Sequence, residues 1–325
     1  MLPFSLSRFF GDGTGPNLLI LGGVHGNEVC GSQAIQQVMQ ELQNGLLRLA
    51  AGSVTFIPIV NAKAYGAQSR GGERDLNREF KRYTNPVLFE DRVTNFLANI
   101  MAECDVLLDL HSFSASGEGF VFVGPEDNTT AVEPFAKAAQ ELQFAQSLGL
   151  RKMVYGWLST YHCFVEEQHA FIATGQAGNA DIPATHADFG VGTTEYFRSL
   201  GKYGVTVECG NHIAPESVAV GHQVIRNALA YLGIAEQPPI LPKPFAESYR
   251  FAQIIIRHHE QDTFPRKWQS FAPVAKGEPL GIRATGEVLV APAEGVVIFS
   301  YEDAAVGTEW LYYAACSIRG TIGLA

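Results

Sequence analysis

Two polar residues follow an apolar run near the start of the chain, and their types suit metal binding. His25 and Glu28 come after NLLILGGV at residues 17–24. Side chains three residues apart meet on one side of a first helical turn, so both can reach one ion. His111 also ends an apolar run, DVLLDLH at 105–111. Two histidines, a carboxylate and a position left to water form a catalytic zinc arrangement. HxxE alone is a weak pattern, and a polar loop at a strand end is the alternative.

A third apolar run, VTVEC at 205–209, contains a carboxylate near its end, Glu208. A carboxylate in such surroundings must be paired, metal-bound or functional. Beside a zinc ion, Glu208 could take a proton from water and pass it to a leaving amine. Arg198 precedes it by ten residues, and a helix could bring it to the same pocket; a surface arginine is the alternative.

Residues 61–86 form a polar stretch rich in glycine and arginine, which predicts a long irregular segment. Long loops in compact domains are usually functional or disordered. Arg70 in this stretch could polarise a carbonyl and stabilise its oxyanion. Arg78, with Asn77, could clamp a carboxylate through paired hydrogen bonds. Asp75 could orient a zinc-binding histidine by accepting its second N–H. The alternative is a solvated loop in which acidic and basic residues balance.

Other polar residues offer weaker patterns. His212 follows Glu208 closely and could line the same pocket, although a structural histidine is an equal alternative. Ser112 and Ser114 lack the surroundings of a nucleophile elbow, which disfavours serine hydrolysis. Gly22-Gly23 does not complete GxGxxG, which disfavours dinucleotide binding.

The elements that must position these residues alternate between strand and helix. Continuous apolar runs suit strands buried on both faces, as in a parallel sheet. Apolar residues at helical spacing follow most of them. The predicted strands are 17–24, 53–60, 105–111, 120–123 and 205–209, and the predicted helices are 27–48, 87–103, 130–148, 192–203 and 215–232. The sequence therefore predicts an α/β fold: a mixed, mainly parallel sheet with helices on both faces.

The chain has 325 residues, which suits one large domain or two. Residues 235–245 hold four prolines and indicate a linker, after which short strands and turns predominate. A small-residue tract at 173–180 is predicted to be a loop. The predicted domains are 1–240, a catalytic domain, and 241–325, a small β domain that caps or flanks the active-site cleft.

Composition narrows the class of protein. The net charge of -10 argues against a nucleic-acid or anionic-membrane surface, so an anionic substrate would need local arginines. No apolar run is long enough for a membrane span. The N-terminus lacks the pattern of a signal peptide. Five cysteines without CxxC spacing suit reduced thiols, which predicts a cytoplasmic protein. Whether the chain forms a homo-oligomer is left open.

Taken together, these residues resemble the succinylglutamate desuccinylase/aspartoacylase family of carboxypeptidase A-like zinc hydrolases. Each matching piece is short, but all occur in the family's order with compatible spacing. The pieces are GGVHGNE at 22–28, Arg70, DLNR at 75–78, DLHS at 109–112 and VECG at 207–210. The resemblance covers roughly residues 17–232, and the tail is similar to the small β domain of that family.

The resemblance implies one zinc ion per chain, bound by His25, Glu28 and His111, with Glu208 as general base and acid. It implies a zinc carboxypeptidase-like fold. It also implies a deacylase, a hydrolase of amide bonds other than peptide bonds, acting on a small anionic N-acyl amino acid. N-succinylglutamate and N-acetylaspartate are the family's types of substrate.

The resemblance also assigns roles in substrate binding. Arg70 would polarise the scissile carbonyl, and Asn77 and Arg78 would hold a substrate carboxylate. Asp75 would support a zinc-binding histidine. Arg198 matches the stretch in which aspartoacylases place a second substrate-binding arginine.

The chain departs from the family pattern in two places. Asn211-His212 follows VECG, where aspartoacylases usually continue with Gly-Pro, and the tyrosines of the aspartoacylase pocket have no match. The acyl group and the amino acid therefore remain open. Two other functions also remain: a zinc carboxypeptidase that acts on short peptides, and a catalytically silent binding protein of the same fold.

Overall fold

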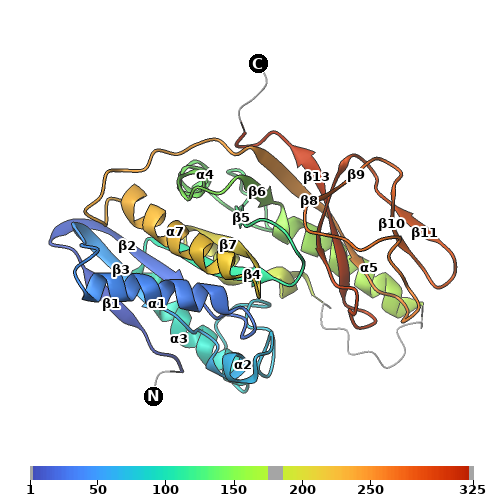
Figure 1. The fold of residues 1–325 in the computed structure, drawn as a ribbon. Coiled ribbons are helices and arrows are strands. Elements are labelled where there is room, and N and C mark those ends of the chain that lie inside the picture. The colour runs from blue at the N-terminus through green and yellow to red at the C-terminus, as the bar shows by residue number, and fades with distance from the viewer. Residues whose placement is uncertain (1–2, 175–185, 322–325) are drawn as a thin grey trace.

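The computed structural model describes residues 3–174 and 186–321, and within them one eleven-stranded sheet runs through the molecule (Figure 1). The strand order is β1-β3-β2-β4-β7-β5-β6-β8-β13-β12-β9, and β10 pairs with β11 separately. The strands are β1 Ser7–Phe10, β2 Gly13–Leu21, β3 Ala51–Ile57, β4 Val106–Phe113, β5 Phe120–Phe122, β6 Lys152–Tyr155, β7 Tyr203–Asn211, β8 Glu247–Ile256, β9 Ala272–Val274, β10 Pro279–Ile282, β11 Val288–Val290, β12 Gly295–Ser300 and β13 Glu309–Ser317. The helices are α1 Val29–Gln43, α2 Ala62–Ala67, α3 Phe89–Glu103, α4 Ala138–Ser147, α5 Trp157–Ala173, the 3-10 helix η1 Ala187–Gly190, α6 Thr193–Ser199 and α7 Pro215–Tyr231.

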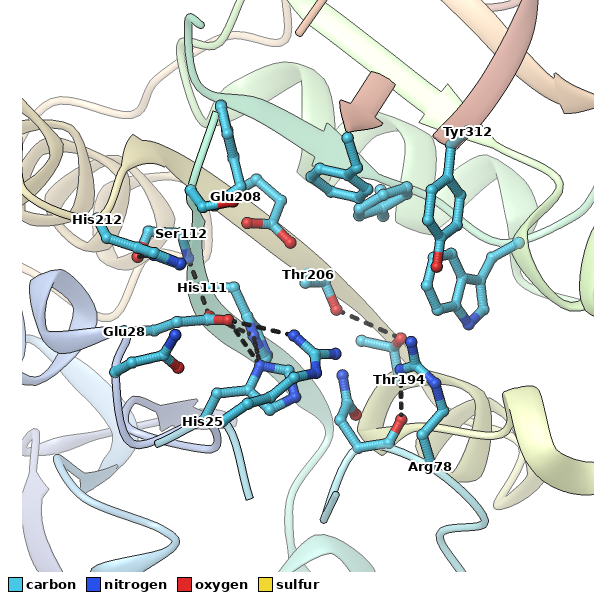
Figure 2. A pocket seen from close by; sticks show the side chains of 18 of the residues that line it. His25, Glu28, Arg78, His111, Ser112, Thr194, Thr206, Glu208, His212 and Tyr312 are labelled. Atoms are coloured by element: carbon cyan, nitrogen blue, oxygen red, sulfur yellow. Dashed lines mark hydrogen bonds and ion pairs between the residues drawn. The ribbon is translucent and has the colours of Figure 1, made fainter. Parts of the chain in front are cut away.

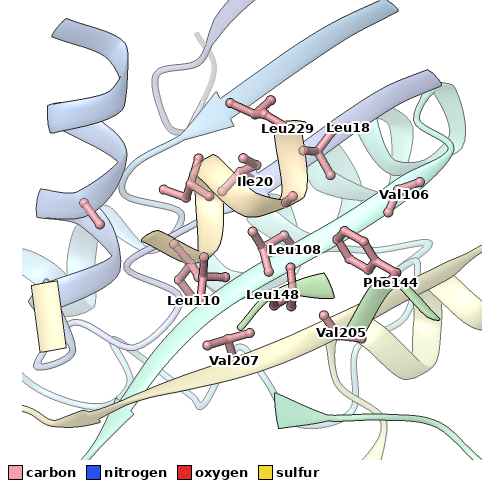
Figure 3. Packing of buried hydrophobic residues seen from close by; sticks show 14 of the residues in the cluster. Leu18, Ile20, Val106, Leu108, Leu110, Phe144, Leu148, Val205, Val207 and Leu229 are labelled. Carbon is pink, nitrogen blue, oxygen red and sulfur yellow. The ribbon is translucent and has the colours of Figure 1, made fainter. Parts of the chain in front are cut away.

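The first part of the sheet is buried on both faces by helices. Successive side chains of a strand point to opposite faces. Leu18 and Ile20 of β2 accordingly join the core under α1, α4 and α7 (Figure 3). Leu19 and Leu21 of the same strand join a second core under α3. This explains the unbroken apolar run, and the predicted α/β fold, with a mixed sheet and helices on both faces, is confirmed.

The C-terminal strands are antiparallel, and they continue the main sheet. β8 pairs parallel with β6, from Lys152↔Glu247 to Tyr155↔Arg250. β13, β12 and β9 then follow in antiparallel order. No helix or strand is assigned between α7 and β8, where the prolines of the predicted linker lie. The division into domains at residue 240 stays a prediction.

Several element boundaries differ from those predicted. Residues 61–86 contain a short helix, α2, because the Asn61 side chain accepts the amide of Ala64 and starts a helical turn. The predicted helix over 130–148 begins only at Ala138. Residues 150–174, where no element was predicted, form β6 and α5. Most of the predicted loop over 173–180 lies outside the described residues. Among the described helices, none is both long enough and apolar enough for a transmembrane segment.

Candidate metal centre and active site

His25 and Glu28 lie in the tight turn that joins β2 to α1. The turn needs glycine at two places. Gly23 has a φ of 58°, which L side chains rarely adopt. A Cβ on Gly26 would lie 2.0 Å from the backbone of Ala64. Glu28 is the N-cap of α1, so the two candidate metal ligands precede the helix instead of lying on its first turn.

His111 and Glu208 reach the same place from neighbouring strands. β4 and β7 are parallel, and their register pairs His111 with Glu208. Paired residues of parallel strands point to the same face of the sheet. Both side chains are almost fully buried. Sheet geometry therefore places the proposed base beside the proposed metal ligand.

Three electron-pair donors converge in the site (Figure 2). Nδ1 of His25 lies 2.8 Å from Oε1 of Glu28, and Nδ1 of His111 lies 2.9 Å from Oε2 of the same carboxylate. The two Nδ1 atoms are 3.2 Å apart. A tetrahedral zinc ion with bonds of about 2.0–2.1 Å places its ligand atoms at comparable separations of about 3.3 Å.

The other ring nitrogens face carboxylates. Nε2 of His25 lies 3.0 Å from Oδ1 of Asp75 in a hydrogen bond. Nε2 of His111 lies 3.0 Å from Oδ2 of Asp109, an ion-pair contact without hydrogen-bond alignment. A carboxylate partner favours a proton on Nε2 and leaves Nδ1 as a lone pair. Two nitrogen lone pairs and a carboxylate then face one another. These electron-rich groups repel one another, and a cation bound between them would stabilise the arrangement. The residues present therefore fit a zinc ion.

Sequence patterns did not single out Asp109, although the sequence contains a signal for it. It precedes His111 by two residues on one strand, so both side chains point to the same face. It is fully buried, and it accepts a hydrogen bond from the hydroxyl of Thr193. Asp75 and Asp109 thus each place a carboxylate next to Nε2 of one of the two histidines.

Arg70 stands at the edge of the three donors. Its Nε donates to Oδ2 of Asp75 at 2.8 Å, and its Nη1 lies 3.6 Å from Oε1 of Glu28. The side chain is 44% exposed. Asp75 therefore contacts both His25 and Arg70, and it fixes the arginine beside the candidate metal centre.

Arg78 is buried in a box of aromatic rings. Its guanidinium carbon lies 5.2 Å from the Trp157 ring, 5.0 Å from the Tyr161 ring and 5.8 Å from the Phe189 ring. Nη2 donates to the Tyr161 hydroxyl at 2.7 Å and to Oε1 of Glu309 at 3.4 Å. Tyr161 and Glu309 are thus its polar side-chain partners.

Asn77 lines the same cavity as Arg78. Its Oδ1 accepts the backbone amide of Thr193 at 2.9 Å, which fixes the orientation of the side chain. Within residues 3–174 and 186–321 its Nδ2 has no hydrogen-bond partner, so this group is free to donate to a ligand.

Glu208 lines a cavity of about 260 Å³ together with the metal-site residues (Figure 2). Its Oε2 is buried and has no hydrogen-bond partner in the described part of the chain. Burial raises the pKa of Glu208 to about 8, and the nearby Glu28 carboxylate adds to the rise. An unpaired carboxylate with a raised pKa beside metal-binding residues is suited to proton transfer.

Arg198 also lines this cavity, but acidic side chains surround it. Its Nε donates to Glu141 at 2.9 Å, and its Nη1 donates to Glu133 at 2.9 Å and to Glu195 at 3.1 Å. We call these four residues the Arg198 cage. The predicted role of Arg198 in substrate binding stays a prediction, and the cage is a second explanation for this arginine.

Two tyrosines of the C-terminal strands reach the cavity, and sequence patterns alone did not predict them. Tyr301 follows β12, and Tyr312 lies on β13.

Ser112 and His212 line the cavity as well, and the Ser112 hydroxyl lies 2.9 Å from Nδ1 of His212. The backbone amide of Ser112 donates to Glu28, so this pair lies directly beside the metal-site carboxylate.

Comparison with known proteins shows what this chain is similar to. A family model described as the succinylglutamate desuccinylase/aspartoacylase catalytic domain matches residues 14–232. The chain is 33% identical over 103 residues to an N-alpha-acetyl-L-2,4-diaminobutyric acid deacetylase of Halomonas elongata. It is 30% identical over 117 residues to a probable aspartoacylase of Nostoc sp..

These curated matches are partial. They cover 31% and 33% of this chain, and 29% and 39% of the relatives' own length. The fold match is wider. The crystal structure of a succinylglutamate desuccinylase/aspartoacylase from Rhodobacter sphaeroides is 19% identical, with a TM-score of 0.69, and the match covers 97% of this chain and 89% of that one.

Proposed function

The chain belongs to the succinylglutamate desuccinylase/aspartoacylase family, and we propose that it is a zinc-dependent amidohydrolase that removes the acyl group from an N-acyl amino acid. The observation that carries this proposal is the convergence of His25, Glu28 and His111 beside the unpaired carboxylate of Glu208. The relatives named above as a deacetylase and a probable aspartoacylase support the same class of reaction.

In this proposal His25 and His111, each through Nδ1, and the carboxylate of Glu28 would hold the zinc ion. When bound, it would supply a Lewis acid that polarises the substrate carbonyl and lowers the pKa of water. Asp75 and Asp109 would keep the proton on Nε2 of each histidine, so that both Nδ1 lone pairs face the ion.

Glu208 would act as the general base and then as the general acid. Its free Oε2 would take a proton from water as the water attacks the acyl carbonyl, and it would give that proton to the leaving amine. Arg70 would donate to the carbonyl oxygen as negative charge develops there. Its contacts with Asp75 and Glu28 keep its head group next to the reacting atoms.

Asn77 and Arg78 would hold the carboxylate of the substrate. Arg78 is the better placed of the two buried arginines, because its aromatic box leaves Nε without a hydrogen-bond partner in the described residues. The free Nδ2 of Asn77 would add a second donor. Tyr301 and Tyr312, from the C-terminal strands, line the same cavity, which favours small substrates over long peptides.

Replacement of Glu208 tests the mechanism. Glu208→Gln should lower kcat by about 10²–10⁴-fold, because the amide cannot accept the proton. Zinc content by elemental analysis should not change, because His25, Glu28 and His111 remain. Glu118→Gln is a matched control, since Glu118 has a side chain 65% exposed and lies outside the cavity. Full activity of Glu208→Gln would refute the mechanism. A separate assay compares N-acyl amino acids with short peptides as substrates of the wild-type protein. Release of amino acids only from the peptides would favour the zinc carboxypeptidase.

A further inference from the structure

The walls of the active-site cavity differ in chemistry. One part is lined by the candidate metal ligands and Glu208. Other parts are lined by Arg198 and Glu195 of the Arg198 cage and by aromatic rings from several strands and one helix. A second carboxylate on the substrate could bind Arg198 only if the guanidinium has N–H groups that are not already used within the protein. The hydrogen bonds of Arg198 show whether it does.

Arg198 has little hydrogen-bonding capacity left. An arginine has five N–H donors. One goes to Glu141 and two go to Glu133 and Glu195. A fourth goes to the backbone carbonyl of Gly204 at 3.2 Å. One N–H remains at most, and a paired, two-bond contact with a ligand carboxylate needs two.

The cage is also negative overall. When its three carboxylates are ionised, they outnumber the guanidinium charge by two. Arg198 is nearly inaccessible, so water screens these charges weakly. Even with one of the three carboxylates protonated, the remaining two outnumber the guanidinium charge by one. A substrate carboxylate brought beside Arg198 would therefore meet net repulsion from the cage.

Contacts with the surrounding backbone hold the residues of the cage in place. Glu141 also accepts the amides of Gly124 and Gly204, so it is fixed without the arginine. A Cβ on Gly124 would lie 2.4 Å from Nε of Arg198, so only glycine fits against the guanidinium. Arg198 is thus enclosed from several directions.

The cage does not offer a free anion to a cationic ligand either. Glu195 is the cage carboxylate that lines the cavity. Its Oε1 accepts from Arg198 and from the Thr194 hydroxyl, and its Oε2 accepts the amide of Gly192. Both oxygens are therefore already paired.

The remaining wall is aromatic. Phe122 lies 5.6 Å from Trp157 and 6.2 Å from Phe299, measured between ring centroids. Tyr312 lies 5.5 Å from Phe299 and stacks at 6.1 Å on Trp157. All four rings line the cavity. Such a surface suits hydrocarbon and aromatic groups, because their burial releases water from both partners.

The backbone at Phe299 supports a functional role for this wall. Phe299 has a φ of 53°, a conformation costly for a residue other than glycine. It lies at a register shift in the pairing of β12 with β13, between Ile298 and Ser300. Bulges of this kind re-aim a side chain, and strained residues cluster at ligand sites. Here the ring faces the cavity.

We propose that the substrate carries a single carboxylate, held at Arg78, and one hydrocarbon or aromatic group that packs against Phe122, Trp157, Phe299 and Tyr312. The cavity thus rejects the second carboxylate of N-acetylaspartate or N-succinylglutamate. This inference rests on the proposed function and specifies the substrate class of that site.

Four substrates test the inference with the zinc-loaded wild-type protein. N-acetylphenylalanine carries the aromatic group on the amino acid, and N-benzoylglycine carries it on the acyl group. N-acetylaspartate and N-acetyl-2,4-diaminobutyrate carry a second charge of either sign. One of the two aromatic substrates should exceed both charged ones in kcat/KM by at least about tenfold, the effect of burying one such group. A charged substrate with the highest kcat/KM would overturn the inference.

Direct binding separates the inference from the proposed reaction. Zinc-loaded Glu208→Gln is titrated calorimetrically with the same four compounds. Tighter binding of an aromatic compound supports the inference, even if the wild type hydrolyses none of the four and the proposed function fails. Tighter binding of a charged compound, or binding of none, refutes it.

A matched pair of variants tests the wall itself. Phe271 also has a positive φ, of 65°, and like Phe299 it packs on Phe120. It does not line the cavity. Phe299→Leu should lower kcat/KM for the preferred aromatic substrate by about three- to tenfold. Phe271→Leu should leave it unchanged. Equal effects of the two variants would argue against the wall as the determinant.

Discussion

The two buried arginines of the cavity have different surroundings. Arg78 is enclosed by the rings of Trp157, Tyr161 and Phe189, and Glu309 is the carboxylate within its reach. Arg198 contacts three carboxylates at 2.9–3.1 Å. Burial is similar for both, so burial does not identify the substrate-binding arginine. The number of protein carboxylates around each arginine distinguishes them. Each such carboxylate neutralises charge and occupies N–H donors that a ligand carboxylate would need.

The contrast follows from where each arginine lies. Arg198 lies in the last turn of α6, one turn after Glu195, and it donates hydrogen bonds to Glu141 of α4 and to the backbone of Gly204 in β7. It therefore fastens three elements together. Arg78 lies on the loop before α3, and its polar side-chain partners come from α5 and β13. Arg78 is therefore placed to form an ion pair with a ligand carboxylate.

Replacement of Arg198 should give the largest effect. Arg198→Met leaves three carboxylates near one another without their cation, two of them deeply buried, so the free energy of unfolding should fall by about 3–5 kcal/mol. Urea denaturation measures this change. Arg226→Met is a control, because Arg226 pairs with Glu41 at the surface and should contribute less than about 1 kcal/mol.

The same variant tests the predicted substrate role of Arg198. A stable Arg198→Met protein with a strongly raised KM would mean that the arginine binds substrate in spite of its cage. The distinction between the two arginines would then be wrong.

Replacement of Arg78 should give the opposite pattern. Arg78→Gln should lower kcat/KM by about 10–100-fold, mainly through KM, because a charged hydrogen bond to the substrate carboxylate is worth about 1.5–3 kcal/mol. The loss of stability should be smaller than for Arg198→Met, because one partly exposed carboxylate, Glu309, is left behind. Steady-state kinetics and urea denaturation measure the two effects.

Tyr161→Phe is the control for Arg78, since it removes a hydrogen-bond partner and keeps the ring. It should change KM less than Arg78→Gln does. If Arg78→Gln instead lost as much stability as Arg198→Met and kept its KM, Arg78 would be a structural residue too.

Sequence patterns predicted the parts of the site that follow from sheet geometry. His111 and Glu208 end apolar runs, and parallel strands bring such ends to one edge of the sheet. His25 and Glu28 were predicted by the same argument. The spacing of Arg70 and Asp75 also suited a solvated loop, and it was the family resemblance that implied roles for both. In the structure Asp75 contacts His25, and Arg70 contacts Asp75.

The Arg198 cage could not be predicted in this way. Glu133 and Glu141 lie 65 and 57 residues before Arg198, and no local spacing links them to it. Phe299 and Tyr312 come from strands far along the chain, and a strand's apolar residues do not show which of them face a cavity. Long-range packing decides these contacts, and with them the charge of the pocket.

Glu133 gives the smallest of the expected effects and tests the balance of charge in the cage. Burial raises the pKa of Glu133 to about 7, and the Glu195 and Glu141 carboxylates add to the rise although Arg198 opposes it. The folded protein thus holds a proton that the unfolded chain releases near pH 4.5. Stability from this group is complete below pH 4.5 and is lost as the pH rises through about 7.

Glu133→Gln resembles the protonated form at every pH. Its unfolding free energy relative to wild type should therefore rise between pH 5 and pH 8, by on the order of 2 kcal/mol, since one pKa unit corresponds to about 1.4 kcal/mol. Urea denaturation of both proteins at several pH values measures the difference, in which pH effects common to both cancel. A difference that stays constant over this range would mean that Glu133 is ionised throughout. The cage would then hold its full negative charge at neutral pH, and its contrast with the box around Arg78 would be sharper still.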